Sequence, residues 1–157
     1  MVSDELPFEL RSVSSDDFQF CWSLYRDLMK PLTMELLGSW NESGQSQMIE
    51  QSLADSGASI IVAGGSDIGW LRTEETEVEI YLGQLYVIPI MQNRGIGTAV
   101  VRQLCDKVSR KGKALTLEVM KNNRAQLLYQ RLGFAVVGSS KYKLKMRWHQ
   151  GNQNSGD

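Results

Sequence analysis

The stretch that decides the fold runs from Leu85 to Thr98 and reads Leu-Tyr-Val-Ile-Pro-Ile-Met-Gln-Asn-Arg-Gly-Ile-Gly-Thr. Its apolar beginning, residues 85–88, predicts a buried strand that ends at Pro89. Further on, apolar residues recur every four positions, which predicts a helix with one apolar face: Ile96, Val100, Leu104 and Val108. The stretch is therefore a strand, a loop with two glycines and the start of a helix.

The loop predicts a site for a pyrophosphate group. The first turn of a helix has backbone N–H groups without internal partners, and the helix dipole adds partial positive charge there. Gly95 and Gly97 have no Cβ, so an anion can approach this backbone closely, and Arg94 adds a full positive charge. These three features together are typical of phosphate binding at a helix start.

Two common phosphate loops do not fit this loop. A P-loop needs Lys-Ser/Thr after its last glycine, and a dinucleotide fingerprint needs a glycine where Val100 stands. The segment Gln92-Asn93-Arg94-Gly95-Ile96-Gly97 instead resembles the Gln/Arg-x-x-Gly-x-Gly/Ala acyl-CoA loop of the GNAT superfamily of N-acetyltransferases. In that family the loop follows a strand ending in Val-x-Pro, as residues 87–89 do here.

A second motif, Asn123 to Phe134, supports the same resemblance. Ala125, Leu128, Tyr129 and Leu132 share one helix face, and Gly133 is placed to end that helix. The segment is similar to the family pattern Asn-x-(x)-Ala-x-x-Leu-Tyr-x-x-x-Gly-Phe. Counting from Asn123 gives the shorter variant of the pattern, and counting from Asn122 gives the longer one.

The resemblance implies a fold, a co-substrate and a set of contacts. The fold class is α/β (α+β): a mixed, mostly antiparallel sheet of about six or seven strands with a splayed parallel pair at its centre, flanked by about four helices. The co-substrate is acetyl-CoA, without a metal. The residues implied to bind it are Leu85, Tyr86, Val87, Gln92, Asn93, Arg94, Gly95, Ile96, Gly97, Thr98, Asn123 and Tyr129.

The reaction implied is transfer of an acetyl group from acetyl-CoA to a primary amine of a small molecule or peptide. Tyr129 matches the family's general acid, which protonates the departing thiolate; packing in the core is its other reading. Glu118 matches a glutamate that some family members use as a base, and Glu79 is its rival. The alternative function is a CoA-binding module that senses acyl-CoA without turnover.

The acceptor is not defined by a shared motif. Tyr25, Met29 and Trp40 stand at helical spacing and either line the acceptor site, with Glu79, or belong to the core. A bulge is predicted near Gly83, because apolar residues stand at even positions before it and at odd positions after it. In the family, the backbone of such a strand pairs with the pantetheine arm.

Size and composition set the remaining expectations. The 157 residues predict one domain, 1–149, with a disordered tail over 150–157. A net charge of −1 gives no general attraction to nucleic acid, and no segment approaches the ~20 apolar residues of a membrane span. The acidic N-terminus lacks the apolar core of a signal peptide. The two cysteines stand in apolar helical patterns, which predicts buried thiols in the reducing cytoplasm. The sequence does not decide whether two copies of the chain form a homodimer.

Several local predictions complete the sequence picture. Pro31 is expected to end the first helix, with residues 32–40 open to a second one. Residues 58–63 and 68–72 are expected to form a hairpin through Gly64 and Gly65, and residues 73–76 a solvated turn. His149 lies in the tail, away from any nucleophile.

Overall fold

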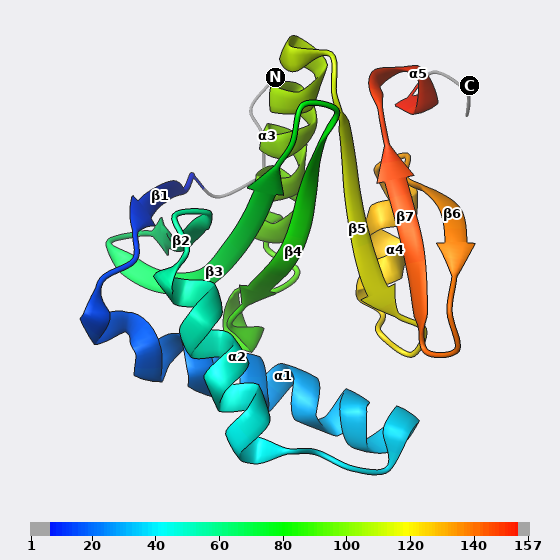
Figure 1. The fold of residues 1–157 in the computed structure, drawn as a ribbon. Coiled ribbons are helices and arrows are strands. Elements are labelled where there is room, and N and C mark those ends of the chain that lie inside the picture. Colours follow the sequence, from blue (N-terminus) through cyan, green and yellow to red (C-terminus); the bar gives the residue numbers. More distant parts are fainter. Residues whose placement is uncertain (1–6, 154–157) are drawn as a thin grey trace. The chain divides into compact units, whose positions relative to one another are not determined.

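The computed structural model describes residues 7–153 and contains one seven-stranded sheet in the order β1-β2-β3-β4-β5-β7-β6 (Figure 1). The N-terminal end and the last four residues of the predicted tail lie outside the described residues. The strands are β1 (Glu9–Ser12), β2 (Ala58–Ala63), β3 (Ser66–Glu75), β4 (Glu79–Val87), β5 (Ala114–Met120), β6 (Ala135–Ser139) and β7 (Lys143–Trp148). The helices are α1 (Phe18–Leu37), α2 (Glu42–Ala54), α3 (Ile96–Lys111), α4 (Ala125–Arg131) and the short α5 (Gln150–Gln153), with two 3-10 turns, η1 (Ser15–Asp17) and η2 (Pro89–Met91).

The sheet contains one parallel pair, β4 with β5, as the fold class predicted. Its register runs from Glu79 opposite Ala114 to Leu82 opposite Leu117. The pairs β1–β2, β2–β3, β5–β7 and β6–β7 are antiparallel. A mixed, mostly antiparallel sheet with an inner parallel pair is therefore confirmed.

The chain divides into two compact units. The first contains the residues up to Arg72 together with Gln84–Ile96, and the second contains Thr73–Gly83 together with the chain from Gly97 onward. The division falls inside β4, directly after Gly83. Each unit is described by itself below.

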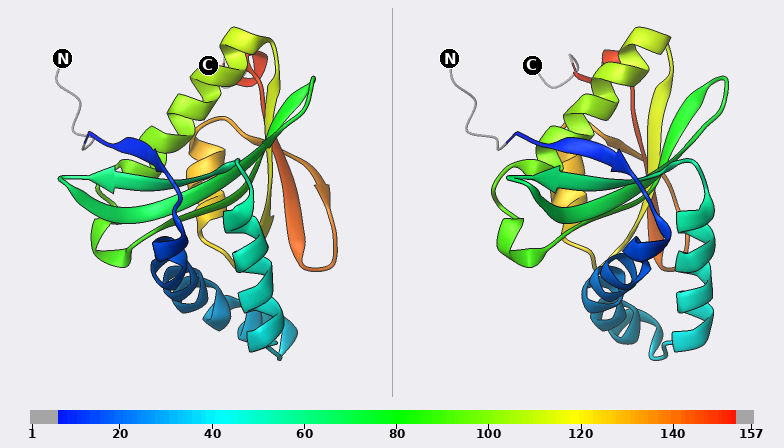
Figure 2. Two further views of the ribbon diagram at one scale, coloured as in Figure 1. Left: turned by 60° about the vertical axis from the view of Figure 1, so that its left-hand side comes forward. Right: turned by 90° about the vertical axis from the view of Figure 1, so that its left-hand side faces the viewer.

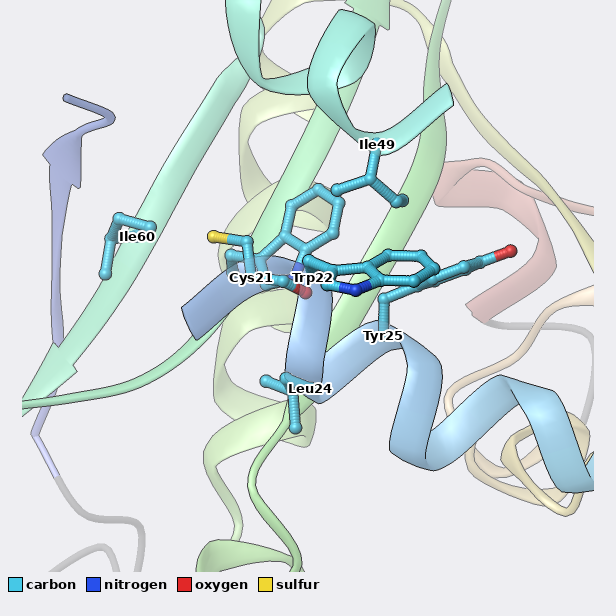
Figure 3. Packing of buried hydrophobic residues seen from close by; sticks show 7 residues of the cluster. Cys21, Trp22, Leu24, Tyr25, Ile49 and Ile60 are labelled. Carbon is cyan, nitrogen blue, oxygen red and sulfur yellow. Dashed lines mark hydrogen bonds between the residues drawn. The ribbon is translucent and has the colours of Figure 1, made fainter. Parts of the chain in front are cut away.

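The first unit packs α1 and α2 against β1, β2 and β3 (Figure 2). Its core contains Cys21, Trp22, Leu24 and Tyr25 from α1, Ile49 from α2, Ile60 from β2 and Trp70 from β3. Figure 3 shows most of these side chains converging from the two helices and the sheet. The buried Trp70 also donates from Nε1 to the Cys21 carbonyl oxygen at 3.2 Å, so this polar atom is satisfied inside the core.

The second unit is built on β5, whose alternate residues Leu115, Leu117 and Val119 are buried. Buried residues of α3 recur at helical spacing, as the sequence predicted: Ile96, Val100, Leu104 and Val108, with Val101 and Cys105 beside them. The helix ends at Lys111, and Gly112 follows in the left-handed conformation. On β5 the exposed Glu118 stands between the buried Leu117 and Val119, as its place in the alternation predicted.

Strand β4 carries the predicted extra residue. Thr76 N donates to the Glu79 carbonyl oxygen at 2.8 Å, which pairs these residues across the β3–β4 turn. Regular pairing would then place Ile68 opposite Val87, because each lies eight residues farther along its strand. The Ile68 oxygen instead accepts from Ile88 N at 2.8 Å, one residue farther on. Burial changes phase in the same interval, from Ile80 and Leu82 to Val87, as a one-residue insertion requires.

The prediction that Pro31 ends the first helix is wrong. Helix α1 continues through Pro31 to Leu37, so residues 32–37 extend the same helix instead of starting another. Pro31 removes one intrahelical hydrogen bond, but the residues after it include the strong helix formers Leu32, Met34 and Glu35. The helix ends at Gly38, which has φ of 79° and donates its N–H to the Met34 oxygen.

Three smaller features differ from the sequence predictions. The turn expected at 73–76 is shorter, because β3 extends to Glu75. Val78, the first of the apolar even-numbered residues that predicted the strand before Gly83, lies in the turn and is 70% exposed. Residues 150–153, placed in the predicted tail, form α5. The hairpin glycines Gly64 and Gly65 both have positive φ, as their turn predicted.

Gly69 provides a test of the first unit's packing. A Cβ added there would lie 2.2 Å from the Tyr86 carbonyl oxygen, a backbone atom that cannot move alone. We expect Gly69→Ala to lower the free energy of unfolding by about 3 kcal/mol, measured by urea denaturation. The matched change Gly138→Ala, whose Cβ would lie 3.8 Å from Lys145 Cβ, should cost less than about 1 kcal/mol. Equal effects of the two changes would contradict the close approach of β3 and β4.

Candidate active site

The predicted pyrophosphate loop has the backbone of a tight, preformed turn. Asn93 has φ of 65° and Gly95 has φ of 82°, so two left-handed residues flank Arg94. Both residue types tolerate this conformation better than most others. The loop is anchored by Gln92, whose Nε2 donates to the Val87 carbonyl oxygen at 2.9 Å. The glutamine of the motif therefore ties the loop to the end of β4.

Helix α3 begins immediately after this loop, at Ile96, and its first turn contains no acidic residue. Its unpartnered N–H groups and the helix dipole therefore face no competing carboxylate from their own turn. Gly97 has ordinary backbone angles, so it is not required for an unusual conformation. A Cβ added there would lie 3.7 Å from Leu128 Cδ2. Within the second unit, the start of α3 thus lies beside α4.

Tyr129 lies on α4, one residue after Leu128, and is 8% exposed. Its ring lies 5.4 Å from the Phe134 ring between centroids, and its backbone oxygen accepts from Phe134 N at 3.0 Å. Burial of the phenol raises the pKa of Tyr129 to about 12, so its hydroxyl stays protonated at neutral pH. Asn123 positions the start of α4, because its Oδ1 accepts from Ala125 N at 2.9 Å.

The two glutamates considered as a base have different surroundings, and both lie in the second unit. Glu79 accepts from the buried Thr116, with Oγ1 to Oε2 at 2.7 Å, so one of its oxygens is already bonded. Glu118 is exposed on β5 and stands opposite Lys145 of β7. An exposed carboxylate is open to a water molecule, which a base acting through water requires.

The residues proposed for the acceptor fall into two groups. Tyr25, Met29 and Trp40 belong to one aromatic cluster of the first unit, in which Tyr25 lies 5.9 Å from Trp40 and 5.4 Å from Tyr86 between ring centroids. Glu79 belongs to the second unit. Tyr86, expected beside CoA, contributes its ring to this cluster and also packs against Trp70 at 5.2 Å.

Sequence reasoning missed Gln45, which belongs to the same cluster. The Tyr25 hydroxyl donates to Gln45 Oε1, and burial raises the pKa of Tyr25 to about 12, so this tyrosine acts as a donor. Gln45 and the buried Ile49 stand four residues apart on α2, which places them on one helix face. That spacing was visible in the sequence, but the partner on α1 was not.

The comparisons with known proteins establish the family. A family model described as an acetyltransferase (GNAT) domain matches residues 29–150, and the chain belongs to this family of GNAT acetyltransferases. No curated protein matches the chain.

Solved structures share the fold. PaiA N-acetyltransferase from Thermoplasma acidophilum, in complex with coenzyme A, has a TM-score of 0.70 at 18% identity, over 92% of this chain and 99% of that one. The ribosomal-protein-S18-alanine N-acetyltransferase from Escherichia coli has a TM-score of 0.66 at 19% identity, over 90% and 92%. Mutant forms of the spermidine/spermine N-acetyltransferase SpeG from Vibrio cholerae have a TM-score of 0.65 at 15% identity, over 96% of this chain and 98% of that one. The GNAT-like fold is confirmed.

Among the described residues, no group of three or more His, Cys, Asp or Glu side chains is placed to hold a metal ion. None of the helices over residues 7–153 is both long and apolar enough to cross a membrane.

Proposed function

We propose that this protein is an N-acetyltransferase that transfers the acetyl group of acetyl-CoA to a primary amine of a small molecule or peptide, by direct attack in a ternary complex. One observation carries the proposal: the start of α3, which is suited to an anion, lies beside Leu128, the residue before the buried Tyr129, because a Cβ added to Gly97 would lie 3.7 Å from Leu128 Cδ2. A phosphate site and a protonated phenol on adjoining helices are what this reaction needs at the two ends of the cofactor.

The loop 92–98 would hold the CoA pyrophosphate through backbone N–H groups, assisted by Arg94. The backbone of residues 85–87, which follows the extra residue of β4, would pair with the pantetheine arm. Asn123 would support the cofactor side of α4, since it fixes the first turn of that helix. Acetyl-CoA supplies the activated acyl group, and this chain supplies its position, a base and an acid.

In the transfer step, the amine nitrogen attacks the thioester carbonyl carbon, and a C–N bond forms as the C–S bond breaks. One amine proton leaves to a base, and the departing sulfur takes a proton from Tyr129. A thiol of pKa ~8.5 in water would make that second transfer uphill from a phenol of pKa about 12. Desolvation of the departing sulfur would raise its pKa as well and narrow this difference.

Glu118 is the base that we propose, acting through water, because Glu79 already accepts a hydrogen bond from Thr116. We expect Glu118→Gln to lower kcat roughly 10²-fold and to remove the acidic limb of the pH–rate profile. The matched variant Glu79→Gln should keep that limb. Rates measured from pH 5 to 9 with a fixed acceptor would assign the base to Glu79 if only the Glu79 variant lost the limb. If both variants kept it, neither glutamate would be the base.

The experiment for the function as a whole is a thiol-release assay with acetyl-CoA and a panel of amines: aminoglycosides, polyamines, amino acids and peptide N-termini. Turnover that depends on one amine class supports the proposal. Tight CoA binding with no turnover in any class would favour an acyl-CoA sensor instead.

A further inference from the structure

The C-terminal part of the chain carries basic residues without acidic ones. Between residues 119 and 153 the sequence contains seven Lys and Arg residues and no Asp or Glu, although the net charge of the whole chain is only −1. All of this segment belongs to the second unit. A separation of charge along a chain indicates a surface that attracts a charged partner.

Strand β7 arranges part of this charge in a row on one face of the sheet. Lys143, Lys145 and Arg147 alternate along the strand and are all exposed. Alternate residues share a face and lie about 7 Å apart. The register of β7 with β5 has no shift, so each member of the row has a defined neighbour: Lys143 stands opposite Met120, Lys145 opposite Glu118 and Arg147 opposite Thr116.

The two ends of this row differ in their balance of charge. The residue opposite Arg147, Thr116, donates to Glu79, so a carboxylate neighbours that end. Lys143 lies at the other end, where β5 finishes and the chain leads into α4. Neither Lys143 nor Lys145 makes an ion pair with a described residue. Lys141, in the turn before the strand, adds to the positive charge at the Lys143 end.

We propose that the acceptor is the N-terminal amine of an acidic peptide, which lies along β7 with its amine at Glu118 and its acidic side chains at Lys145 and Lys143. This inference rests on the proposed function, with Glu118 as its base, and names the acceptor class. Alternate side chains of an extended peptide are also about 7 Å apart. Carboxylates two residues apart in the peptide therefore match the spacing of the two lysines.

The chemistry of a peptide N-terminus suits this site. Its amine has a pKa of ~7.7–8.0, against ~10.4 for a lysine side chain, so less free energy is needed to make it a nucleophile at neutral pH. The ammonium group first releases one proton to water. The neutral amine then loses a second proton to Glu118 as the amide forms, and Tyr129 protonates the departing sulfur as in the transfer step above.

The charges on this face disfavour two other kinds of ligand. A polyamine would bring further positive charge to Lys143 and Lys145. RNA, a uniform polyanion, would place phosphates against Glu118 as well as against the lysines. A molecule with an amine at one end and carboxylates along the rest is complementary to the whole row.

The kinetic test uses two peptides with free N-termini and amidated C-termini, Ala-Glu-Ala-Glu-Ala and Ala-Gln-Ala-Gln-Ala. In wild type, kcat/KM for the glutamate peptide should exceed that for the glutamine peptide about 10-fold at low ionic strength, the worth of two exposed ion pairs. The preference should shrink as salt is added. Equal kcat/KM for the two peptides, or a higher value for Ala-Lys-Ala-Lys-Ala, would overturn the proposal.

The variant Lys143→Glu reverses one charge of the row, and Arg110→Glu, at an exposed position of α3 in the same unit, is the control with the same net charge. In Lys143→Glu the preference for the glutamate peptide should disappear, with an unchanged melting temperature and unchanged CoA affinity. Arg110→Glu should keep the preference. An equal loss in the two variants would mean that net charge alone attracts the peptide, and this would overturn the proposal.

A binding measurement separates failure of this inference from failure of the proposed function. If wild type acetylates no amine, the proposed function fails, and fluorescence anisotropy of both peptides, labelled at their C-termini, tests the face alone. Tighter binding of the glutamate peptide, lost in Lys143→Glu, supports the face, and equal binding of both peptides contradicts it. Stronger competition by oligouridylate than by unlabelled glutamate peptide would assign the face to nucleic acid and overturn the proposal. Turnover of another amine class, without a preference between the peptides, would leave the proposed function standing and overturn this inference.

Discussion

Tyr129→Phe will lower kcat roughly 10²- to 10⁴-fold, the usual contribution of general acid catalysis, or about 3 to 5 kcal/mol in the barrier. The variant keeps the ring that packs 5.4 Å from Phe134 and removes only the hydroxyl. Folding should therefore change little, and KM for acetyl-CoA should stay within a few-fold, because the lost interaction belongs to the transition state. The measurement is steady-state thiol release, with CoA affinity measured by calorimetry.

The control for this change is Tyr142→Phe, which removes a hydroxyl from a half-buried tyrosine of the same unit that lies against Lys141. It should keep wild-type turnover. A Tyr129→Phe protein that unfolds or loses CoA affinity would instead assign Tyr129 a packing role. Undiminished turnover would remove this hydroxyl from the mechanism, and water would then have to protonate the thiolate.

Gly97→Glu will weaken CoA binding by at least about 10²-fold, because it places a carboxylate and its bulk in the first turn of α3, where the pyrophosphate is expected. The control is Gly97→Ala. Its Cβ would meet only Leu128 Cδ2, at an ordinary contact distance of 3.7 Å, so folding should be unaffected. Calorimetric titration with CoA measures both variants. Unchanged affinity in a folded Gly97→Glu protein would place the pyrophosphate elsewhere.

Local patterns were sufficient to predict most of the strands and the helix that follows the loop. The apolar alternation of Leu115, Leu117 and Val119 identified β5, and the four-residue recurrence from Ile96 identified α3. The change of phase around Gly83 even predicted an extra residue in β4, which the register of Ile68 with Ile88 bears out. These features depend on residues close together in the sequence, where burial alone sets the pattern.

The failures arose where one local rule opposed another or where the partner is distant. Pro31 opposes a helix, but the helix formers after it and the left-handed Gly38 determine where α1 ends. Val78 looked like a strand residue because it is apolar, yet the turn between Thr76 and Glu79 exposes it. The bond from Thr116 to Glu79 joins residues 37 apart, and the bond from Tyr25 to Gln45 joins residues 20 apart. Neither spacing follows a helical or strand period, so no local pattern could predict these contacts.

The roles of the site residues in chemistry are proposals that rest on two motifs and on their local geometry. The left-handed Asn93 and Gly95 and the Gln92 anchor suit a cofactor loop, and in the second unit the start of α3 at Gly97 lies beside Leu128 of α4. They do not define the acceptor, because the aromatic cluster around Tyr25 carries no family motif. The acceptor therefore has to be identified by comparing substrates.

The most direct test of the central claim is single-turnover acetyl transfer by wild type and Tyr129→Phe, followed by thiol release and by mass of the acetylated acceptor. The account predicts that wild type releases one thiol for each amide formed on a primary amine. It also predicts that Tyr129→Phe binds CoA equally well and forms the same amide roughly 10²- to 10⁴-fold more slowly. Thiol release without any amide product, or equal rates in the two proteins, would contradict it.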